Sequence, residues 1–249
     1  MVYLVPVFNH SYCTVRAVNR AARQVRQEIE MKMGILGAGF IGRAMATLAK
    51  QSGYDVMISN SRGPQTLMST AAAIGCHVGT AREAAVFGDV VVVAVPFHSY
   101  PALPVAELEG KIVIDTCNYY PERDGHIDAL DQYATTTSEL IARHLHGARL
   151  VKAFNAILAK DLETDGTPPG TPHRRALPMA GDDLAAKQAV AGVLDQFGFD
   201  AVDAGPLSAS WRFERAKPVY CVRLDREGLL EKLAEAKRDV EVPHGSWRR

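Results

Sequence analysis

The sequence lacks the features that mark several classes of protein. Its 249 residues carry 28 Lys plus Arg against 28 Asp plus Glu, so no excess of positive charge is available to hold nucleic acid or an anionic membrane. The longest apolar runs, such as Val90 to Val95, are far shorter than the roughly 20 residues that span a bilayer. We therefore expect neither a nucleic-acid partner nor a membrane partner.

Cysteine is also scarce. The four cysteines, Cys13, Cys76, Cys117 and Cys221, are widely separated, with no C-x-x-C pair and no histidine spacing that suits zinc. A disulfide framework needs a closer pattern, so we expect reduced thiols, no metal site and a cytoplasmic location.

The first thirty residues differ from the rest of the chain. The apolar start is broken by Asn9 and His10 and has no positive residue ahead of it, which argues against a secretory signal. The arginine spacing from Arg16 to Arg26 is similar to that of a transit peptide or a short amphipathic helix. The pattern that opens near Met31 needs nothing upstream, so we expect residues 1–30 to be a dispensable extension.

From Met31 onward, short β-branched runs alternate with helical stretches, as in parallel strands joined by crossover helices. Strands are predicted at Met33–Leu36, Asp55–Ser59, Cys76–Val78, Val90–Val95, Lys111–Asp115, Leu150–Phe154, Leu177–Ala180 and Ala201–Ala204. Helices are predicted at Phe40–Gln51, from Pro64, and at Arg82–Phe87, Glu139–Leu145, Asp182–Gln196 and Arg226–Lys237. The run at Val90 is apolar on both faces, which requires a sheet covered on both sides. The expected fold class is α/β, a Rossmann-type doubly wound, mainly parallel sheet with a small C-terminal α/β extension.

Two irregular stretches divide this pattern. Residues 119–138 lose periodicity, and the proline-rich stretch from Asp165 to Pro178 is expected to be a linker or lid. We expect a nucleotide-binding domain at 31–160 and a smaller part at 161–249 that completes the pocket.

A glycine-rich loop follows the first strand and opens the first helix. It fits G-x-G-x-x-G with the residues Gly37, Ala38, Gly39, Phe40, Ile41 and Gly42. The first glycine permits the tight turn, the second lets the backbone approach a pyrophosphate, and the third allows helix and strand to pack closely. The loop predicts a dinucleotide whose phosphates rest on the helix N-terminus.

The end of the second strand predicts which dinucleotide binds. An NAD enzyme places an acidic residue there for the ribose hydroxyl, whereas this chain has Ser59, Asn60, Ser61 and Arg62. A guanidinium and short hydroxyl donors suit a 2′-phosphate, so we expect NADP(H). The alternative is that Arg62 is merely solvated and that Asn60 and Ser61 form a turn.

The ligand of a doubly wound sheet crosses the crevice at the carboxyl ends of the first and fourth strands. Val95, Pro96 and Phe97 are expected to line the nicotinamide and its ribose. Asn118 and Tyr119, which follow the fifth strand, and Asn155, which follows the sixth, are expected to face the same crevice. His98 is a candidate acid or base, although a lone histidine beside a helix start is more often a cap or a packing residue.

Taken in order, these segments resemble one known family. The segments are Gly34 to Gly42, Ser59 to Pro64, Val93 to Pro96, Ile114 to Asn118, Val151 to Asn155 and Ala180 to Asp183. They are similar to the NADP oxidoreductases typified by the deazaflavin-dependent NADP reductases, whose second cofactor is coenzyme F-420. The similarity runs from about Lys32 to Leu233, and the cytosolic reductase domain of the six-transmembrane metalloreductases is in the same family.

The resemblance implies a homodimeric enzyme that transfers hydride between NADPH and a deazaflavin or flavin-like acceptor. Hydride exchange between the two rings needs no protein acid or base. The stretch from Tyr120 to Thr137 and the proline-rich loop are longer than in the shortest members, so the acceptor stays open. One alternative is a carbonyl or imine reductase, for which Lys152 is a candidate proton donor. Another is a non-catalytic redox sensor that binds NADPH.

Overall fold

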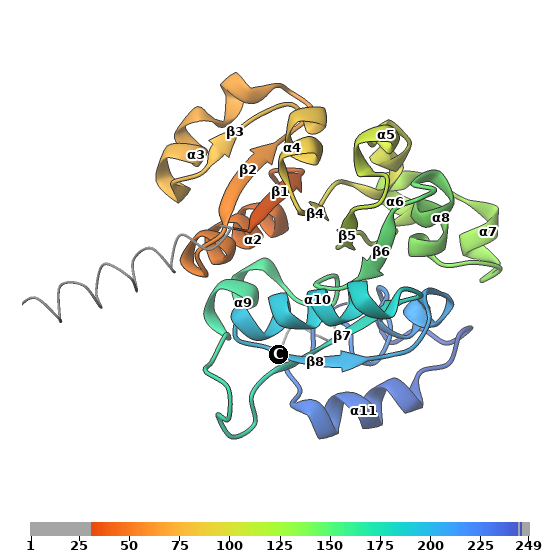
Figure 1. The fold of residues 1–249 in the computed structure, drawn as a ribbon. Coiled ribbons are helices and arrows are strands. Elements are labelled where there is room, and N and C mark those ends of the chain that lie inside the picture. The colour runs from red at the N-terminus through yellow and green to blue at the C-terminus, as the bar shows by residue number, and fades with distance from the viewer. Residues whose placement is uncertain (1–30, 244, 246–249) are drawn as a thin grey trace, which may run out of the picture. The chain divides into compact units, whose positions relative to one another are not determined.

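The computed structural model describes residues 31–243 and 245, in which eight strands form one sheet in the order β3-β2-β1-β4-β5-β6-β7-β8 (Figure 1). The strands are β1 Lys32–Leu36, β2 Asp55–Ser59, β3 His77–Val78, β4 Val90–Val93, β5 Ile112–Asp115, β6 Arg149–Lys152, β7 Ala176–Gly181 and β8 Asp200–Asp203. Strands β1 to β6 pair in parallel, β7 pairs antiparallel to β6, and β8 is parallel to β7. The predicted Rossmann-type fold is confirmed, with its change of strand order between β1 and β4.

Helices cover both faces of the sheet. The α-helices of the described residues are α2 Phe40–Gln51, α3 Met68–Ile74, α4 Ala81–Phe87, α5 Val105–Leu108, α6 Pro121–Asp124, α7 Asp128–Asp131, α8 Thr137–His144, α9 Ala159–Thr164, α10 Leu184–Gln196 and α11 Arg226–Glu235. Short 3₁₀ helices run over η1 Pro64–Leu67, η2 Phe97–Ala102 and η3 Leu207–Phe213. None of the helices in the described part of the chain has the length and apolar character of a membrane span.

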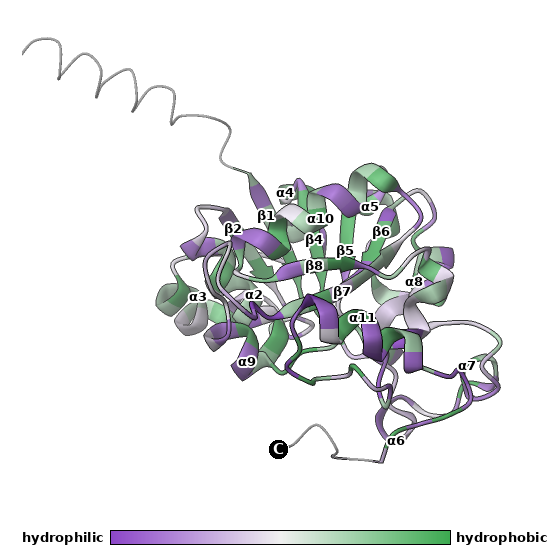
Figure 2. Ribbon diagram, turned by 90° about the horizontal axis from the view of Figure 1, so that it is seen from below, coloured by the Kyte–Doolittle hydropathy of each residue, from purple (hydrophilic) through white to green (hydrophobic). Residues whose placement is uncertain are grey.

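The buried side chains of the strands alternate between two cores. Val90 and Val92 of β4 pack with α2, α9 and α10, whereas Val91 and Val93 pack with α4, α5 and α8. Successive strand side chains point to opposite faces, so a strand between two helical layers must be apolar throughout. Figure 2 shows the apolar strands lying inside and the polar residues on the helices outside. This is the physical basis of the prediction made from the valine run.

The structure refines the predicted elements at several places. Strand β4 ends at Val93 and not at Val95, so the chain leaves the sheet two residues earlier than expected. The aperiodic stretch after β5 holds the one-turn helices α6 and α7. Helix α8 begins with a capping box in which Thr136 and Glu139 satisfy each other's backbone N–H groups, and this ends the irregular stretch.

The proline-rich loop is fixed to the body by two buried arginines. Arg174 donates to the carbonyls of Thr167 and Gly198 and pairs with Asp195 and Asp200. Arg175, which is 0% exposed, pairs with two aspartates on the other side, Asp161 and Asp165. A loop held by charge-assisted bonds at its end is an anchored connection and not a free linker.

The C-terminal part continues the sheet through the short antiparallel contact of Val151 and Lys152 with Gly181 and Ala180. A third apolar cluster joins β7, β8 and α11. The division at residue 160 stays a prediction, and the extension at 1–30 lies outside the described residues.

Candidate functional site

The glycine loop lies between the carboxyl ends of β1 and β4. Gly37 has a φ of +112°, and a Cβ there would lie 2.2 Å from the carbonyl oxygen of Ala94. A Cβ on Gly42 would lie 1.9 Å from the carbonyl oxygen of Gly37. Both positions therefore accept only glycine, since the loop packs on the strand beside it and on its own helix.

Gly39 is different because no atom of the described protein lies within 4 Å of an added Cβ. It is the N-cap of α2, and no side chain of the described residues caps that helix. The first N–H groups of this twelve-residue helix therefore have no side-chain acceptor among the described residues, an arrangement that favours a phosphate. The residues present fit the pyrophosphate of a dinucleotide.

The remaining loop residues frame this opening. Phe40 is 85% exposed, whereas Ala38 and Ile41 are half-buried against the core of the α2 face. The Nε atom of Arg43 donates to the carbonyl oxygen of Ala38 at 2.9 Å, so this exposed arginine braces the loop from one turn along α2. Sequence reasoning missed Arg43, although its place one residue after the last glycine of the motif is a usable signal.

The end of β2 divides its four predicted residues into two groups. Ser59 is 1% exposed and its hydroxyl donates to the carbonyl of Ile35, so its side chain faces the sheet and is not available to a ligand. Asn60 accepts from the backbone N–H of Arg62 and donates to Thr66, which is the turn-forming role of the alternative interpretation. Ser61 and Arg62 are exposed, and the Arg62 side chain makes no hydrogen bond to another described residue. The turn thus presents one free guanidinium beside the glycine loop.

The segment after β4 requires a correction. Val95 is half-buried and Pro96 is exposed, as the predicted lining requires, but the ring of Phe97 is 0% exposed. It packs against Tyr100 and Tyr119 with ring centroids 5.1 and 6.0 Å apart. Phe97 is therefore a core residue in edge contact with Tyr119 and does not line the crevice.

His98 is joined to a buried carboxylate. Its Nδ1 atom lies 2.9 Å from Oδ1 of Asp124, a side chain that is 0% exposed, while the imidazole itself is 49% exposed. Burial alone would raise the pKa of Asp124, but hydrogen bonds from Arg123, from the Tyr120 N–H and from His98 lower it to about 2. The carboxylate is thus ionised and accepts, so the His98 ring presents its other nitrogen to the surface.

Asn118 and Asn155 are brought together at the ends of β5 and β6. The Nδ2 atom of Asn118 donates to the carbonyl of Asn155, and the Nδ2 atom of Asn155 donates to Oδ1 of Asn118 at 3.1 Å and to the carbonyl of Phe213. The buried Oδ1 atom of Asn155 has no partner among the described residues. An orphaned acceptor at the sheet's carboxyl edge is suited to a donor from a ligand or a water.

Lys152 is not placed to donate a proton to a substrate. It is 0% exposed, and its ammonium donates to the carbonyl of Cys117 and to the hydroxyls of Thr137 and Ser138, with Asp115 at 3.5 Å. These bonds join β5, β6 and α8. Lys152 therefore neutralises Asp115 inside the protein, which is the role expected of a buried charge.

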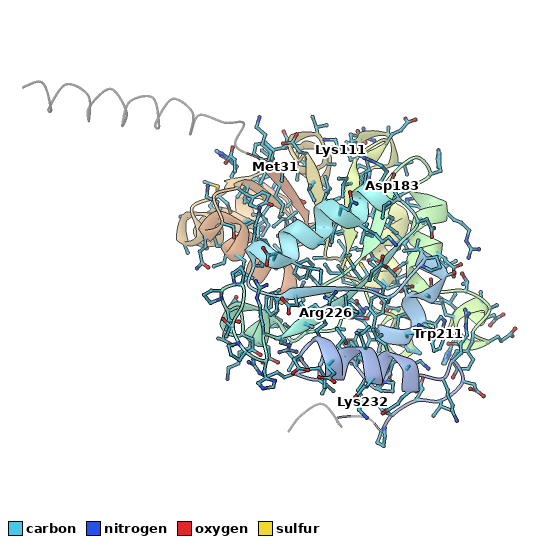
Figure 3. The ribbon with its side chains drawn as sticks, turned by 60° about the horizontal axis from the view of Figure 1, so that its bottom comes forward. Met31, Lys111, Asp183, Trp211, Arg226 and Lys232 are labelled. Carbon is cyan, nitrogen blue, oxygen red and sulfur yellow. The ribbon has the colours of Figure 1, made fainter. Side chains whose placement is uncertain are left out.

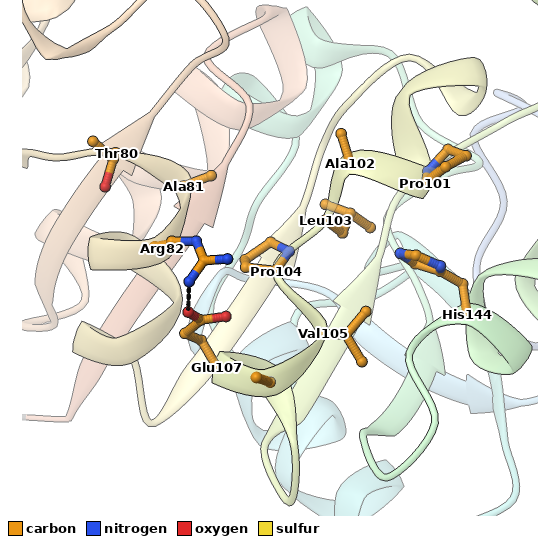
Figure 4. Close-up of a pocket in the computed structure, with 11 residues that line it drawn as sticks. Thr80, Ala81, Arg82, Pro101, Ala102, Leu103, Pro104, Val105, Glu107 and His144 are labelled. Atoms are coloured by element: carbon orange, nitrogen blue, oxygen red, sulfur yellow. Dashed lines mark hydrogen bonds and ion pairs between the residues drawn. The ribbon is translucent and has the colours of Figure 1, made fainter.

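Two pockets flank this edge of the sheet. One, of about 330 Å³, we call the Trp211 pocket; it is lined by Tyr119, Pro121, Glu122, Leu130, Asp131, Tyr133, Thr135, Thr137, Trp211, Glu214, Arg215, Lys217, Arg238 and Glu241. Another, of about 530 Å³, lies between α4, α5 and α8 and contains the Arg82–Glu107 ion pair (Figure 4). The pocket of Figure 4 holds none of the predicted site residues, whereas the Trp211 pocket begins at Tyr119, directly after Asn118.

Part of this chain is similar to known proteins. Residues 32–119, which contain the glycine loop and the β2 turn, match the family model described as "NADP oxidoreductase coenzyme F420-dependent". Metalloreductase STEAP3 of Rattus norvegicus is 31% identical over 185 residues, which are 74% of this chain and 36% of that protein. The chain thus spans about a third of the length of this relative.

Two solved structures share the fold over most of the chain. A hypothetical protein of Sinorhizobium meliloti is 28% identical with a TM-score of 0.69, covering 82% of this chain and 99% of that one. A protein of Arthrobacter, assigned by name to the F-420-dependent NADP reductases, is 26% identical with a TM-score of 0.63, covering 72% and 87%. The resemblance carried by the motifs is therefore confirmed over residues 32–119, which match the model of the F-420-dependent NADP oxidoreductase family.

Proposed function

We propose that this protein transfers a hydride from NADPH to the ring of a deazaflavin, coenzyme F-420, or of a flavin. The observation that carries the nucleotide half is the contrast among the three glycines. Gly37 and Gly42 are enclosed by protein atoms, whereas Gly39 faces open space at an uncapped helix N-terminus. This is the arrangement that a pyrophosphate requires.

The choice of NADPH over NADH is supported by the β2 turn. In it Asn60 fixes the backbone at Arg62, so the guanidinium projects from an ordered turn with no carboxylate beside it in the sequence. A fixed cation without an acidic neighbour favours a 2′-phosphate over a ribose hydroxyl. Ser61 adds a second exposed donor at the same turn.

Direct hydride transfer is supported by what the residues at the sheet edge can do. NADPH, when bound, supplies the hydride, so the protein's task is to align two rings and to exclude water. Pro96 and Val95 offer an apolar edge, and the paired amides of Asn118 and Asn155 are held rigidly by hydrogen bonds to each other. The candidate proton donor Lys152 is buried and already bonded to protein oxygens.

One observation, the pairing of His98 with Asp124, supports the alternative that the protein is a carbonyl or imine reductase. His98 is half exposed and is held at its Nδ1 atom by the ionised Asp124, so its other ring nitrogen is open to a substrate. A substrate that needs a proton as well as a hydride would use such a group.

The deciding experiment titrates the protein and NADPH with oxidised coenzyme F-420, FMN and simple carbonyls while the nicotinamide absorbance is followed. We expect oxidation of NADPH with the deazaflavin or the flavin. Oxidation with carbonyls alone would replace the proposal by its alternative, and oxidation with none of these acceptors would contradict both.

A further inference from the structure

The Trp211 pocket lies almost wholly outside residues 32–119, the segment that the family model matches. Apart from Tyr119, each of its lining residues follows residue 119, where the family match ends. One wall comes from the irregular stretch that holds α6 and α7, and the other comes from η3 and the segment after α11. Figure 3 shows Trp211 on the side of the molecule where these segments lie.

The pocket adjoins the proposed site of hydride transfer. Tyr119 follows Asn118 in the chain, and Glu214 follows Phe213, whose carbonyl accepts from Asn155. Both walls are thus continuous with the amide pair at the ends of β5 and β6. A volume of about 330 Å³ is at the lower end of the range for small-molecule sites, which suits one part of a ligand and not a whole dinucleotide.

Most charges in the pocket are already neutralised by protein. Arg215 pairs with Glu122 at 2.9 Å, and Asp131 accepts from Tyr119 and lies 3.0 Å from His126. Glu214 accepts from both the N–H and the hydroxyl of Thr137.

Lys217 is likewise saturated, because its ammonium donates to the carbonyls of Lys237, Arg238 and Val240. These bonds hold the segment after α11 against the pocket. Its ammonium also lies 5.6 and 5.9 Å from the ring centroids of Tyr133 and Trp211, so two aromatic faces are fixed beside it.

Among the described residues that line the pocket, Arg238 is the cation whose side chain has no hydrogen-bond acceptor. Its guanidinium carbon lies 5.9 Å from the ring centroid of Trp211, and its buried Nε atom has no hydrogen-bond partner among the described residues. A buried guanidinium donor without an acceptor is costly, which makes an anionic acceptor from a ligand favourable there. The carboxylate of Glu241 lies exposed at the rim.

We propose that the Trp211 pocket binds the phosphate-bearing side arm of the electron acceptor, with Arg238 as the anion donor and Trp211 as an apolar wall. This inference rests on the proposed function and names the acceptor class as a flavin or deazaflavin that carries a phosphate. The shared chemistry is an anionic group attached through a flexible arm to a planar ring.

The test compares ligands that share a ring and differ in the phosphate. The full-length protein is titrated with FMN and riboflavin, and with coenzyme F-420 and its phosphate-free core, while the fluorescence of each ring is followed without NADPH. We expect the phosphorylated member of one pair to bind roughly tenfold or more tightly, and the pair that shows this identifies the acceptor. Equal affinities within both pairs, or no binding of any of the four, would overturn the proposal.

Two arginines provide a matched comparison. Arg212 also lies 5.9 Å from the Trp211 ring but does not line the pocket. We expect Arg238→Met to abolish the preference for the phosphorylated ligand and Arg212→Met to keep it. An equal loss in both variants would show a general role of charge near Trp211 and would overturn the assignment.

A second variant leaves the Arg238–Trp211 contact intact. Glu241→Gln removes the rim carboxylate, so the phosphorylated ligand should bind more tightly while its phosphate-free partner is unchanged. A phosphate preference that is unaltered in both Glu241→Gln and Arg238→Met contradicts the proposal. If the phosphorylated ligand is preferred but its ring accepts no hydride from NADPH, the proposed function is wrong while the assignment of the Trp211 pocket stands.

Discussion

The imidazole of His98 is held at its Nδ1 atom by Oδ1 of Asp124, 2.9 Å away, and the two residues come from different loops at the carboxyl edge of the sheet. Asp124 also accepts from Arg123 and from the N–H of Tyr120. The pair therefore fixes the loop after β5 against the loop after β4. It is a structural connection whether or not His98 transfers a proton.

The proposed direct transfer makes a prediction for His98. Replacement by Gln keeps a polar side chain but removes the acid, and hydride transfer from NADPH to the accepting ring should stay within about tenfold, or roughly 1.4 kcal/mol in the barrier. A general acid contributes about 10²–10⁴-fold. A single-turnover rate reduced by that larger amount, with NADPH affinity unchanged, would favour the carbonyl or imine reductase.

Asp124 should make the fold sensitive to acid. Its pKa is lowered to about 2 by the bonds to Arg123, Tyr120 and His98, which outweigh burial, whereas an unfolded aspartate titrates near 3.9. A depressed native pKa contributes stability that is present above the unfolded value and lost as the pH falls toward 2.

At pH 7 the free energy of unfolding of Asp124→Asn, measured by urea denaturation, should therefore be about 1–3 kcal/mol lower than that of the wild type. The difference should shrink between pH 4 and pH 2. A difference that is constant over this range would show that the carboxylate's charge does not contribute.

Much of the fold could be predicted because its signals are local. Strand and helix periodicity predicted all eight strands and the α-helices of seven residues or more, but not the shorter α5, α6, α7 and α9. Each strand of a doubly wound sheet is buried on both faces by helices, so its apolar run is easily recognised. The one-turn helices α6 and α7 have no such periodicity. Helix α6 is held by Asp124, which accepts from the N–H of Tyr120 and from the N–H of His98 in another segment, and no periodicity marks such contacts.

The candidate site could be predicted where the backbone admits only one type of residue. Gly37 and Gly42 are required by backbone contacts, so the motif marks them directly. Phe97 and Ser59 were misjudged because a sequence position at a strand end does not say whether the side chain turns inward. The Trp211 pocket combines residues more than a hundred positions apart, such as Tyr119 and Arg238, and no local pattern connects them.

The glycine loop allows binding to be separated from folding. Gly39→Ala adds a methyl group that meets no protein atom within 4 Å, at a φ of −71° that alanine adopts freely. The melting temperature should be unchanged, while NADPH binding, followed by its fluorescence, should weaken by tenfold or more because the methyl group occupies the place of the pyrophosphate.

Gly42→Ala should instead lower the stability by about 1–3 kcal/mol, because its Cβ would meet the Gly37 carbonyl oxygen at 1.9 Å. Equal effects of the two variants on stability would contradict this assignment.

Arg62 should decide the nucleotide. Its guanidinium is exposed, without a side-chain hydrogen bond in the described protein, at a turn that Asn60 orders. A hydrogen bond to a charged partner contributes about 1.5–3 kcal/mol, and screening at an exposed site favours the low end of that range. Arg62→Ala should therefore weaken NADPH binding by roughly tenfold at low salt, leave NADH binding unchanged, and reduce the salt dependence of NADPH binding.

Arg82→Ala is the matched control, because this arginine is also exposed but pairs with Glu107 away from the glycine loop. Equal weakening of both nucleotides would mean that Arg62 supports the turn, and no effect on either would place the recognition of the 2′-phosphate elsewhere.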